Sequence, residues 1–336
     1  MYSLSGATIL VTGGTGSFGR RFVETVLQTT DPKKIIVFSR DELKQHEMRS
    51  ALPEDHYPTL RFFIGDVRDA DRLGEALRGV DHIVHAAALK QVPTAEYNPF
   101  EAIKTNVLGA QNVIRAAIAR GVRQVVALST DKAANPINLY GATKLCADKL
   151  FVAANAMSGE GGPAFSVVRY GNVFGSRGSV VPFFLSRRAS GVLPITDPGM
   201  TRFSITLRQS VDFVLRCLKD MRGGEVFVPK MPSYRLLDLA HAIAPEANGE
   251  TVGIRPGEKL HEVLVPINDA RQALEFPDRF VIQPAHPWWE GREALEEAGG
   301  IRCPPGFAYR SDSNPDRLTV EALRDMVNAY RSEHES

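Results

Sequence analysis

Residues 7–19 read ATILVTGGTGSFG, an apolar run followed directly by a glycine-rich loop. Gly13, Gly16 and Gly19 follow one another at three-residue steps, between a predicted strand and a helix predicted over 19–30. Glycines at this spacing let a backbone loop approach a pyrophosphate closely, and the N-terminus of the following helix favours its negative charge. The stretch therefore predicts a dinucleotide site rather than an ordinary surface turn.

The predicted dinucleotide site extends to the other residues of this loop and to the ends of the following strands, where such ligands lie. Asp66 and Val67 follow the third apolar run, where a side chain can hold an adenine. Besides the three glycines, we expect the site to include Thr15, Ser17, Phe18, Ser39, Arg40, Asp66, Val67, Ala86 and Ala87.

The fold class follows from apolar runs rich in β-branched residues that alternate with amphipathic segments. The runs cover 7–13, 34–40, 61–67, 81–88, 123–130 and 165–170. Over 98–121 apolar residues recur at three- and four-residue steps, which predicts one helix that starts at Asn98-Pro99 and ends at Gly121. Strands alternating with helices indicate an α/β fold, a doubly wound, Rossmann-like parallel sheet covered on both faces.

The alternation loosens after about residue 180. Shorter strand candidates follow, VLPITD (192–197) and GEVFVP (224–229), and a last helix is predicted over 319–330. We therefore predict a cofactor-binding domain over 1–180, to which some later segments return. A smaller, less regular substrate-binding lobe and the C-terminal helix are predicted over 181–336.

Composition excludes several classes of protein. With 43% apolar residues, 24% charged residues and a net charge of +1, the chain is typical of globular proteins and has no broad basic field for nucleic acid or membranes. Three scattered cysteines and no ligand cluster predict neither disulfides nor a metal site. Because no signal-peptide pattern or membrane-length apolar run is present, we expect a soluble cytoplasmic protein.

The choice of dinucleotide depends on VFSRDEL (37–43), the end of the second predicted strand. A basic residue there suits a ribose 2′-phosphate, whereas an acidic one suits a free 2′-hydroxyl. Ser39 and Arg40, with Lys44 nearby, favour NADP, while Asp41 keeps NAD as the alternative. In a second interpretation Arg40 only caps the strand and pairs with Asp41.

Residues 129–144, STDKAANPINLYGATK, gather groups that can move protons. Thr130, Asp131 and Lys132 follow a predicted buried strand, so we expect them to face the ligand crevice. Tyr140 and Lys144 share one helix face, and an ammonium near a phenol favours a phenolate that can exchange protons with a sugar hydroxyl. The structural alternative is a capping turn with an exposed ion pair, followed by an ordinary amphipathic helix.

Five segments together resemble the extended short-chain dehydrogenase/reductase superfamily: TGGTGSFG, HAAALK, STDKAANP, YGATK and RYGNVFGSRGSVVPFF. Within it they are similar to the inverting UDP-N-acetylglucosamine 4,6-dehydratases, which open pseudaminic acid biosynthesis for flagellin or other surface glycans. The likeness runs from residue 6 to about residue 282.

The resemblance implies a reaction sequence with a tightly held, recycled NADP. C4 is oxidised, the C5 proton is removed, the 6-hydroxyl leaves as water, and the hydride returns to C6 with inversion at C5. Tyr140 would be the base for the 4-hydroxyl, and Lys144 would lower the pKa of Tyr140 and hold the nicotinamide ribose. Asp131 would protonate the departing hydroxyl, and Thr130 would bind the 4-oxygen.

Lys132 stands where retaining relatives carry a glutamate that acts as the base at C5. An amine must be neutral to act as a base, which partial desolvation near the positive charge of the cofactor favours. The resemblance makes the Asp-Lys pair the mark of inversion. It leaves open whether Lys132 or Tyr140 delivers the proton to the opposite face of C5.

The same resemblance implies UDP-N-acetylglucosamine as the substrate. Guanidinium groups suit its diphosphate because they meet phosphate oxygens bidentately. The residues implied in substrate binding are Lys90, Asn172, Arg202, Arg255 and Glu258. Ser204, in MTRFSITL, departs from the family, which has an aromatic residue there.

Three other functions remain open at this point. A retaining nucleotide-sugar 4,6-dehydratase or a C4 epimerase would share Tyr140 and Lys144 without needing the Asp-Lys pair. A non-catalytic NADP-sensing protein would keep the glycine loop but has no reason to retain the proton-transfer groups. Because relatives are often hexameric and the superfamily commonly pairs through helices, the resemblance also implies a homo-oligomer, a dimer or a hexamer.

Overall fold

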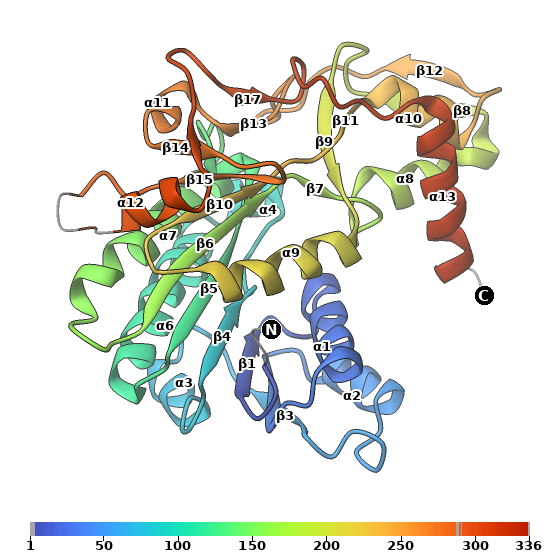
Figure 1. The fold of residues 1–336 in the computed structure, drawn as a ribbon. Coiled ribbons are helices and arrows are strands. Elements are labelled where there is room, and N and C mark those ends of the chain that lie inside the picture. Colours follow the sequence, from blue (N-terminus) through green and yellow to red (C-terminus); the bar gives the residue numbers. More distant parts are fainter. Residues whose placement is uncertain (1–3, 287–288, 290, 335–336) are drawn as a thin grey trace.

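The computed structural model describes residues 4–286, 289 and 291–334, and its centre is a large twisted sheet (Figure 1). Ten strands form this sheet: β1 (Thr8–Thr12), β2 (Lys34–Ser39), β3 (Leu60–Ile64), β4 (His82–His85), β5 (Gln124–Thr130), β6 (Ala164–Tyr170), β10 (Val226–Pro229), β14 (Ala273–Glu275), β15 (Arg279–Ile282) and β16 (Ile301–Arg302). Their order is β16-β14-β15-β10-β6-β5-β4-β1-β2-β3.

The parallel part of this sheet confirms the predicted fold class. Strands β1 to β6 and β10 pair in parallel, in the order of a doubly wound nucleotide-binding sheet. The order reverses at β1, between β2 and β4, and ligands bind outside the carboxyl ends of the strands at such a point. Strands β15, β14 and β16 continue the sheet in antiparallel pairing.

Helices cover both faces of the sheet. The helices of this part are α1 (Ser17–Thr29), α2 (Glu42–Ala51), α3 (Ala70–Ala76), α4 (Val92–Tyr97), α5 (Pro99–Ile103), α6 (Gly109–Arg120), α7 (Leu139–Met157), α9 (Leu207–Asp220), α11 (Ile267–Ala270) and α12 (Gly291–Glu297). Helix α6 packs between α3 and α7, whereas α1 packs against α9. Figure 1 shows these two groups on opposite sides of the sheet.

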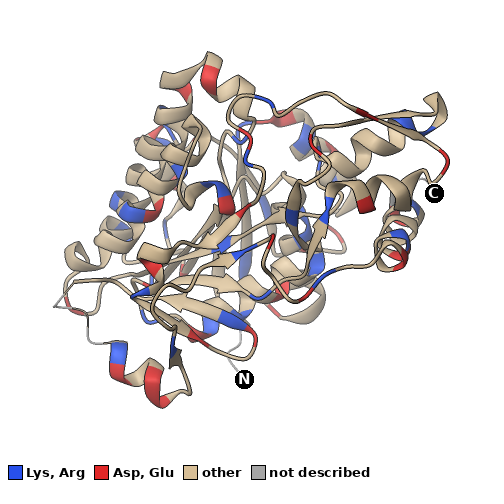
Figure 2. Ribbon diagram, turned by 90° about the horizontal axis from the view of Figure 1, so that it is seen from above, with Lys and Arg blue, Asp and Glu red and all other residues tan. Residues whose placement is uncertain are grey.

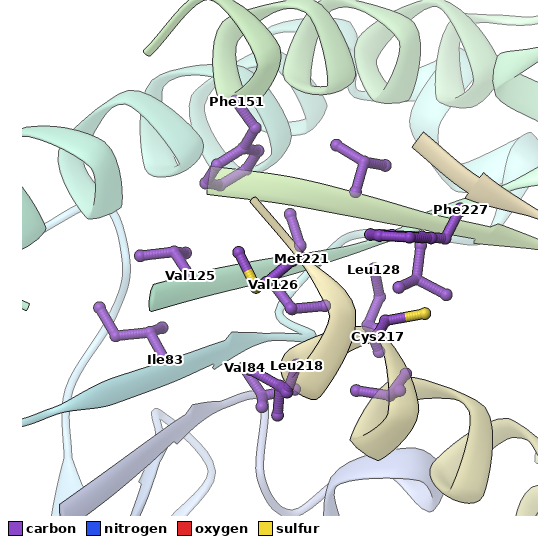
Figure 3. Packing of buried hydrophobic residues seen from close by; sticks show 14 of the residues in the cluster. Ile83, Val84, Val125, Val126, Leu128, Phe151, Cys217, Leu218, Met221 and Phe227 are labelled. Atoms are coloured by element: carbon purple, nitrogen blue, oxygen red, sulfur yellow. The ribbon is translucent and has the colours of Figure 1, made fainter. Parts of the chain in front are cut away.

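The main hydrophobic core fills the space between the sheet and its helices. Figure 3 shows Phe151 of α7 and Leu218 of α9, with Val125 and Val126 of β5 among the residues of the cluster. All four side chains are fully buried. Burying side chains of this size stabilises a fold by about 1.5–3 kcal/mol each, so this core holds the strand ends in fixed positions.

The helix predicted over 98–121 is interrupted. It forms as α5, a π-helical turn at Lys104–Leu108 (η1) and α6, which ends at Gly121 with φ 65° as the capping pattern predicted. The buried side chain of Asn106 in the π turn bonds to Leu89 and Thr143. These tertiary hydrogen bonds explain why the turn departs from α-helical pairing.

The remaining elements form a second group. They are β7 (Asn172–Val173), α8 (Val180–Arg187), η3 (Arg188–Ser190), β8 (Val192–Ile195), β9 (Thr201–Ile205), β11 (Ser233–Arg235), α10 (Leu236–Ile243), β12 (Asn248–Thr251), β13 (Val263–Val265), β17 (Tyr309–Arg310) and α13 (Val320–His334). Small sheets order them as β11-β9-β7, β12-β8 and β13-β17. A separate hydrophobic cluster, which includes Phe184, Leu239 and Leu323, joins α8, α10 and α13. Helix α13 extends slightly beyond the predicted 319–330.

One predicted strand lies elsewhere than expected. We counted GEVFVP (224–229) with the smaller lobe, but β10 pairs with β6 and β15 inside the large sheet. Strands β14 to β16 join the same sheet, so segments beyond residue 180 return to it more extensively than the sequence suggested. The division into two domains at residue 180 stays a prediction.

The charged residues follow no single pattern on the ribbon. Figure 2 shows Lys and Arg interspersed with Asp and Glu over the described part of the chain. Among the residues 4–286, 289 and 291–334, no helix has both the length and the apolar character needed to cross a membrane.

Candidate active site

A cleft of about 750 Å³ lies at the carboxyl ends of the parallel strands, and this volume is typical of ligand sites. It brings together most of the residues that the sequence singled out. The predicted site residues that line it are Gly13, Thr15, Gly16, Ser17, Phe18, Gly19, Ser39, Arg40, Asp66, Val67, Ala86, Ala87, Lys90, Thr130, Asp131, Lys132, Tyr140, Lys144 and Asn172.

The glycine loop owes its shape to two close backbone approaches. Gly13 has φ +64°, and a Cβ there would lie 2.9 Å from the backbone of Ala87. A Cβ on Gly19 would lie 2.5 Å from the Cα of Gly14. The backbone between β1 and α1 is therefore packed so closely that neither position tolerates a side chain. The N-terminus of α1 opens on the cleft at Ser17.

We expect Gly13→Ala to release the cofactor more than it destabilises the fold. An alanine with positive φ costs about 1–2 kcal/mol, and the clash with Ala87 would in addition displace the loop. Retention of dinucleotide should fall at least about tenfold, measured by cofactor content after gel filtration and by titration calorimetry.

Gly121→Ala is the matched control, because Gly121 has φ +65° and no atom within 4 Å of its Cβ position. It should lose similar stability and keep its cofactor. Equal retention of cofactor in the two variants would contradict the role assigned to the close approach at Gly13.

The end of β2 presents basic groups to the cleft. Arg40 lies 3.6 Å from Asp66, and it does not pair with Asp41 as the structural interpretation had it. Asp41 instead caps α2 and binds Lys44 through both the backbone nitrogen at 3.0 Å and Nζ at 2.5 Å. Hydrogen bonds from Lys44 therefore lower the pKa of Asp41, and this carboxylate is engaged within its own helix start.

The turn with the predicted proton-transfer groups Asp131 and Lys132 follows β5 as one 3₁₀ turn, Asp131–Ala133 (η2). Thr130 Oγ1 donates to Asp131 Oδ1 at 2.8 Å, and Lys132 Nζ donates to the same oxygen at 2.9 Å. Asp131 is fully buried, so its ion pair is not the exposed surface pair of the structural alternative. Asn138 caps α7 by accepting a hydrogen bond from Gly141 N, which starts the helix next to this turn.

Tyr140 and Lys144 lie on the cleft side of α7, as the spacing predicted. Burial raises the pKa of Tyr140 to about 12, against the opposing effects of Lys132 and of a hydrogen bond with Thr130. Lys144 Nζ donates to the carbonyl of Leu128 at 2.7 Å, and burial lowers its pKa. Lys132 is a cation that lowers the pKa of Tyr140 in this arrangement, and the effect assigned to Lys144 stays a prediction.

Lys132 is positively charged in this arrangement, whereas a base at C5 would need a neutral amine. Burial alone would lower the pKa of Lys132, but the carboxylates of Asp131 and Glu262 outweigh it and hold the pKa above its usual value. Lys132 Nζ lies 2.9 Å from Asp131 and 3.4 Å from Glu262. In this arrangement the residue is therefore an ammonium group, a proton donor, and a neutral amine beside the positive charge of a bound cofactor stays a prediction.

Unpaired polar atoms mark where the cleft would take a ligand. Buried polar atoms in proteins are nearly always hydrogen-bonded, so an unpaired one needs an explanation. Four such atoms belong to residues that line the cleft: Thr105 Oγ1, Asp131 Oδ2, Asn172 Oδ1 and Ser179 Oγ. Together with the glycine loop and the N-terminus of α1, this donor and acceptor set fits a dinucleotide beside a polar second ligand.

The predicted substrate residues divide into two groups. Lys90 and Asn172 line the cleft. Arg202, Arg255 and Glu258 are not among its lining residues. Arg202 is turned inward, with Nη1 bonded to the carbonyls of Thr201 and Leu260, and Arg255 is exposed on the loop that precedes β13.

The loop that carries Arg255 and Glu258 is nevertheless hydrogen-bonded to the segment around η2. Asn138 donates to the carbonyl of Gly257 at 2.7 Å, and Lys259 Nζ donates to the carbonyl of Ala134 at 2.6 Å.

Ser204, the departure from the family pattern, is buried on β9 opposite Asn172, and its hydroxyl has no hydrogen-bond partner.

Sequence reasoning missed Thr105, Ser179 and Glu262. The only local signal for Ser179 was its place in GSRGS, and Thr105 lies in the π turn that interrupts a regular helical pattern. Glu262 reads as part of a short strand and had no visible link to Lys132.

Among the described residues, no three His, Cys, Asp or Glu side chains are grouped to hold a metal ion.

Comparison with known proteins places these motifs in a wider group. Residues 9–284 match the family described as polysaccharide biosynthesis protein. A UDP-N-acetylglucosamine 4,6-dehydratase (inverting) from Campylobacter jejuni is 51% identical over 331 residues, 96% of this chain and 98% of the relative. A UDP-glucose 4-epimerase from Rickettsia akari is 47% identical over 331 residues, 95% of each chain.

Solved structures show the same architecture. Pen from Bacillus thuringiensis superposes with a TM-score of 0.88 at 38% identity, over 98% of this chain and 99% of Pen. A double mutant of the dTDP-glucose 4,6-dehydratase DesIV from Streptomyces venezuelae, with NAD bound, gives a TM-score of 0.66 at 25% identity. That match covers 75% of this chain and 86% of DesIV.

Proposed function

We propose that this chain, which belongs to the polysaccharide biosynthesis protein family and to the extended short-chain dehydrogenases/reductases, is an inverting UDP-N-acetylglucosamine 4,6-dehydratase. Its product would be UDP-2-acetamido-2,6-dideoxy-β-L-arabino-hex-4-ulose, which makes it a hydro-lyase. The observation that carries the proposal is the meeting of Thr130, Asp131, Lys132, Tyr140 and Lys144 in one cleft with a glycine loop. The 51% identity to a relative of that name supports it.

The oxidation step would use Tyr140, Thr130 and Lys144. When bound, a nicotinamide cofactor supplies a hydride acceptor for C4 and later a hydride donor for C6. Tyr140 would take the proton of the 4-hydroxyl, and Thr130 would hydrogen-bond the 4-oxygen. The side chains of Tyr140 and Thr130 are hydrogen-bonded to one another, so both could reach the same sugar oxygen. Lys144 lines the same cleft and would hold the nicotinamide ribose.

The elimination step would use the Asp-Lys pair. Once C4 is a ketone, the C5 proton is acidic. Asp131, an ionised carboxylate beside Lys132, would take the C5 proton and pass it to the 6-hydroxyl, which then leaves as water. The unpaired Oδ2 of Asp131 is available for this contact. Because Lys132 is charged, we assign to it the delivery of a proton to C5 after the hydride has returned to C6, in preference to Tyr140.

The cofactor would be NADP, held tightly and recycled. Arg40 lines the cleft, and Asp41, the residue that would favour NAD, is engaged with Lys44. NAD is the dinucleotide bound to the DesIV mutant, so NAD remains the alternative. The contacts would come from the glycine loop, from Ser39 and Arg40, and from the ends of β3 and β4.

We expect Arg40→Ala to weaken NADP binding about tenfold or more and to leave NAD binding nearly unchanged. A hydrogen bond to a charged group contributes about 1.5–3 kcal/mol, and only NADP has the 2′-phosphate that would lose it. Titration calorimetry of both dinucleotides would measure the effect. Arg49→Ala is the control, because its side chain is 53% exposed like that of Arg40 and contacts Glu54 and the ring of Phe62 outside the cleft.

The proposed reaction is tested by incubating the pure protein with UDP-N-acetylglucosamine in deuterated water, without added cofactor, and following C5 and C6 by NMR. We expect a 4-keto-6-deoxy product of L-arabino configuration with solvent deuterium at C5. A D-xylo product as the first species would identify a retaining dehydratase. A 4-epimer that keeps its 6-hydroxyl and gains no deuterium would identify an epimerase, the activity named for the Rickettsia relative.

No turnover, even with dinucleotide supplied, would favour another sugar or an NADP-sensing protein.

We propose that the protein works in the cytoplasm as a homo-oligomer. The exposed apolar side chains of Tyr97, Phe100 and Leu108, on neighbouring helical segments, are consistent with a face that a second copy covers.

A further inference from the structure

We propose that Glu262, in the reaction assigned above, is a positioning residue that holds the ammonium group of Lys132 beside Asp131 for proton delivery to C5. Glu262 lies directly before β13, and its side chain is 2% exposed. It is not among the residues that line the cleft, so it would act through Lys132 and not by touching the substrate. This proposal rests on the proposed function.

The geometry of Glu262 supports this role. Its Oε1 lies 3.4 Å from Lys132 Nζ and 3.7 Å from Arg202 Nε, so one carboxylate oxygen bridges two cations. The backbone on either side of the carboxylate is fixed, because Glu262 N donates to Ser311 Oγ at 2.9 Å and Ser311 N donates to Glu262 O at 3.0 Å. The carboxylate is therefore held behind Lys132 by the pairing of β13 with β17.

Lys132 is placed between this buried carboxylate and the cleft. Its side chain is 25% exposed, whereas those of Asp131 and Glu262 are 1% and 2% exposed. The two carboxylates thus hold the ammonium group from the protein side, and its remaining face is directed to the cleft that it lines. A group held in this way can present a proton to a ligand from one fixed direction, which inversion at C5 requires.

The charges around Lys132 make Glu262 the second carboxylate, after Asp131, that favours its ammonium form. The titratable and charged groups near it are Asp131 on the same turn, Tyr140 on α7, Arg202 on β9, Tyr234 on β11, and Lys259 and Glu262 before β13. Two carboxylates therefore face three cations, Lys132, Arg202 and Lys259, which leaves an excess of positive charge. Without the charge of Glu262, a single carboxylate would remain, and both burial and cation repulsion would favour loss of the proton from Lys132.

The test is the titration of Lys132 in the full-length wild type and in Glu262→Gln, which removes the charge and keeps the size. Lysine labelled with ¹⁵N at the side chain is followed by NMR, and the Lys132 signal is identified by its loss in Lys132→Arg. We expect Lys132 of the wild type to stay protonated as long as the protein is folded, and that of Glu262→Gln to titrate at least about one pH unit lower. The rate of product formation should begin its alkaline decline at a correspondingly lower pH.

Two further variants keep the test decisive. Glu262→Asp retains the charge at a longer distance and should shift the titration by less than Glu262→Gln. Glu225→Gln is the matched control, since Glu225 is fully buried and accepts hydrogen bonds from Ser166, Arg222 and Gly223 outside the cleft. It should lower stability without moving the titration of Lys132.

An unchanged titration of Lys132 in a folded Glu262→Gln protein would overturn the proposal, whatever its effect on stability. The titration needs no turnover, so it separates two kinds of failure. If the wild type makes no dehydrated product, the proposed function fails. The holding of Lys132 by Glu262 is still decided by the NMR signal.

Discussion

Tyr140→Phe should abolish the first chemical step and leave the bound cofactor oxidised when UDP-N-acetylglucosamine is added. The substitution removes the phenol that takes the proton of the 4-hydroxyl, and loss of such a group lowers rates about 10²–10⁴-fold. The ring itself stays, so the packing around residue 140 should be kept. Stopped-flow absorbance of the reduced nicotinamide, in a single turnover, measures the step directly.

Tyr309→Phe is the control for this variant. Tyr309 is 7% exposed and Tyr140 is 8% exposed, and burial raises the pKa of both to about 12. The hydroxyl of Tyr309, however, bonds to the backbone of Met231 outside the cleft. Tyr309→Phe should lose about 1 kcal/mol of stability for each hydrogen bond and keep hydride transfer. Normal reduction of the cofactor in Tyr140→Phe would contradict the assigned role.

Asp131→Asn should stop the reaction one step later, with reduced cofactor accumulating on the enzyme. Tyr140, Thr130 and Lys144 remain to oxidise C4, but an amide cannot protonate the departing 6-hydroxyl. Product formation should fall about 10²–10⁴-fold while the reduced nicotinamide still appears in the first turnover. The two variants thus differ in the redox state of the bound cofactor, which the same absorbance measurement reads.

Asp269→Asn provides the comparison for Asp131→Asn. Asp269 pairs with Arg169 at 3.2 Å and does not line the cleft, so its loss should affect stability and not elimination. If Asp131→Asn released product at the wild-type rate, another group would have to supply the proton. If it failed to reduce the cofactor at all, Asp131 would be needed already for the oxidation of C4.

The parts of the fold that were predictable carry local signals. The positive φ of Gly13 follows from a glycine between a strand and a helix, and the parallel sheet follows from alternating apolar runs. The place of the turn η2 was predictable as well, because Asp131 and Lys132 directly follow the buried strand β5 and its end faces the crevice. In each case the residues that set the geometry are neighbours in the chain.

What the sequence did not predict depends on contacts between distant segments. Glu262 and Lys132 are 130 residues apart, and nothing in HEVLV indicates that its glutamate reaches the turn η2. The charge of Lys132 depends partly on that contact, which the local sequence does not contain. Strand β10 has the same difficulty, because a four-residue apolar run does not specify which sheet it joins.

The distance between Lys132 and Glu262 along the chain has a consequence for synthesis of the protein on the ribosome. The glycine loop, the turn η2 and helix α7 leave the ribosome first, and Glu262 follows Lys132 by 130 residues. At about 5–20 residues per second, this delay is about 6.5–26 s. During that interval the nascent chain carries a complete glycine loop and a Lys132 that still lacks its second carboxylate, so the dinucleotide loop is complete before the proton donor is held in place.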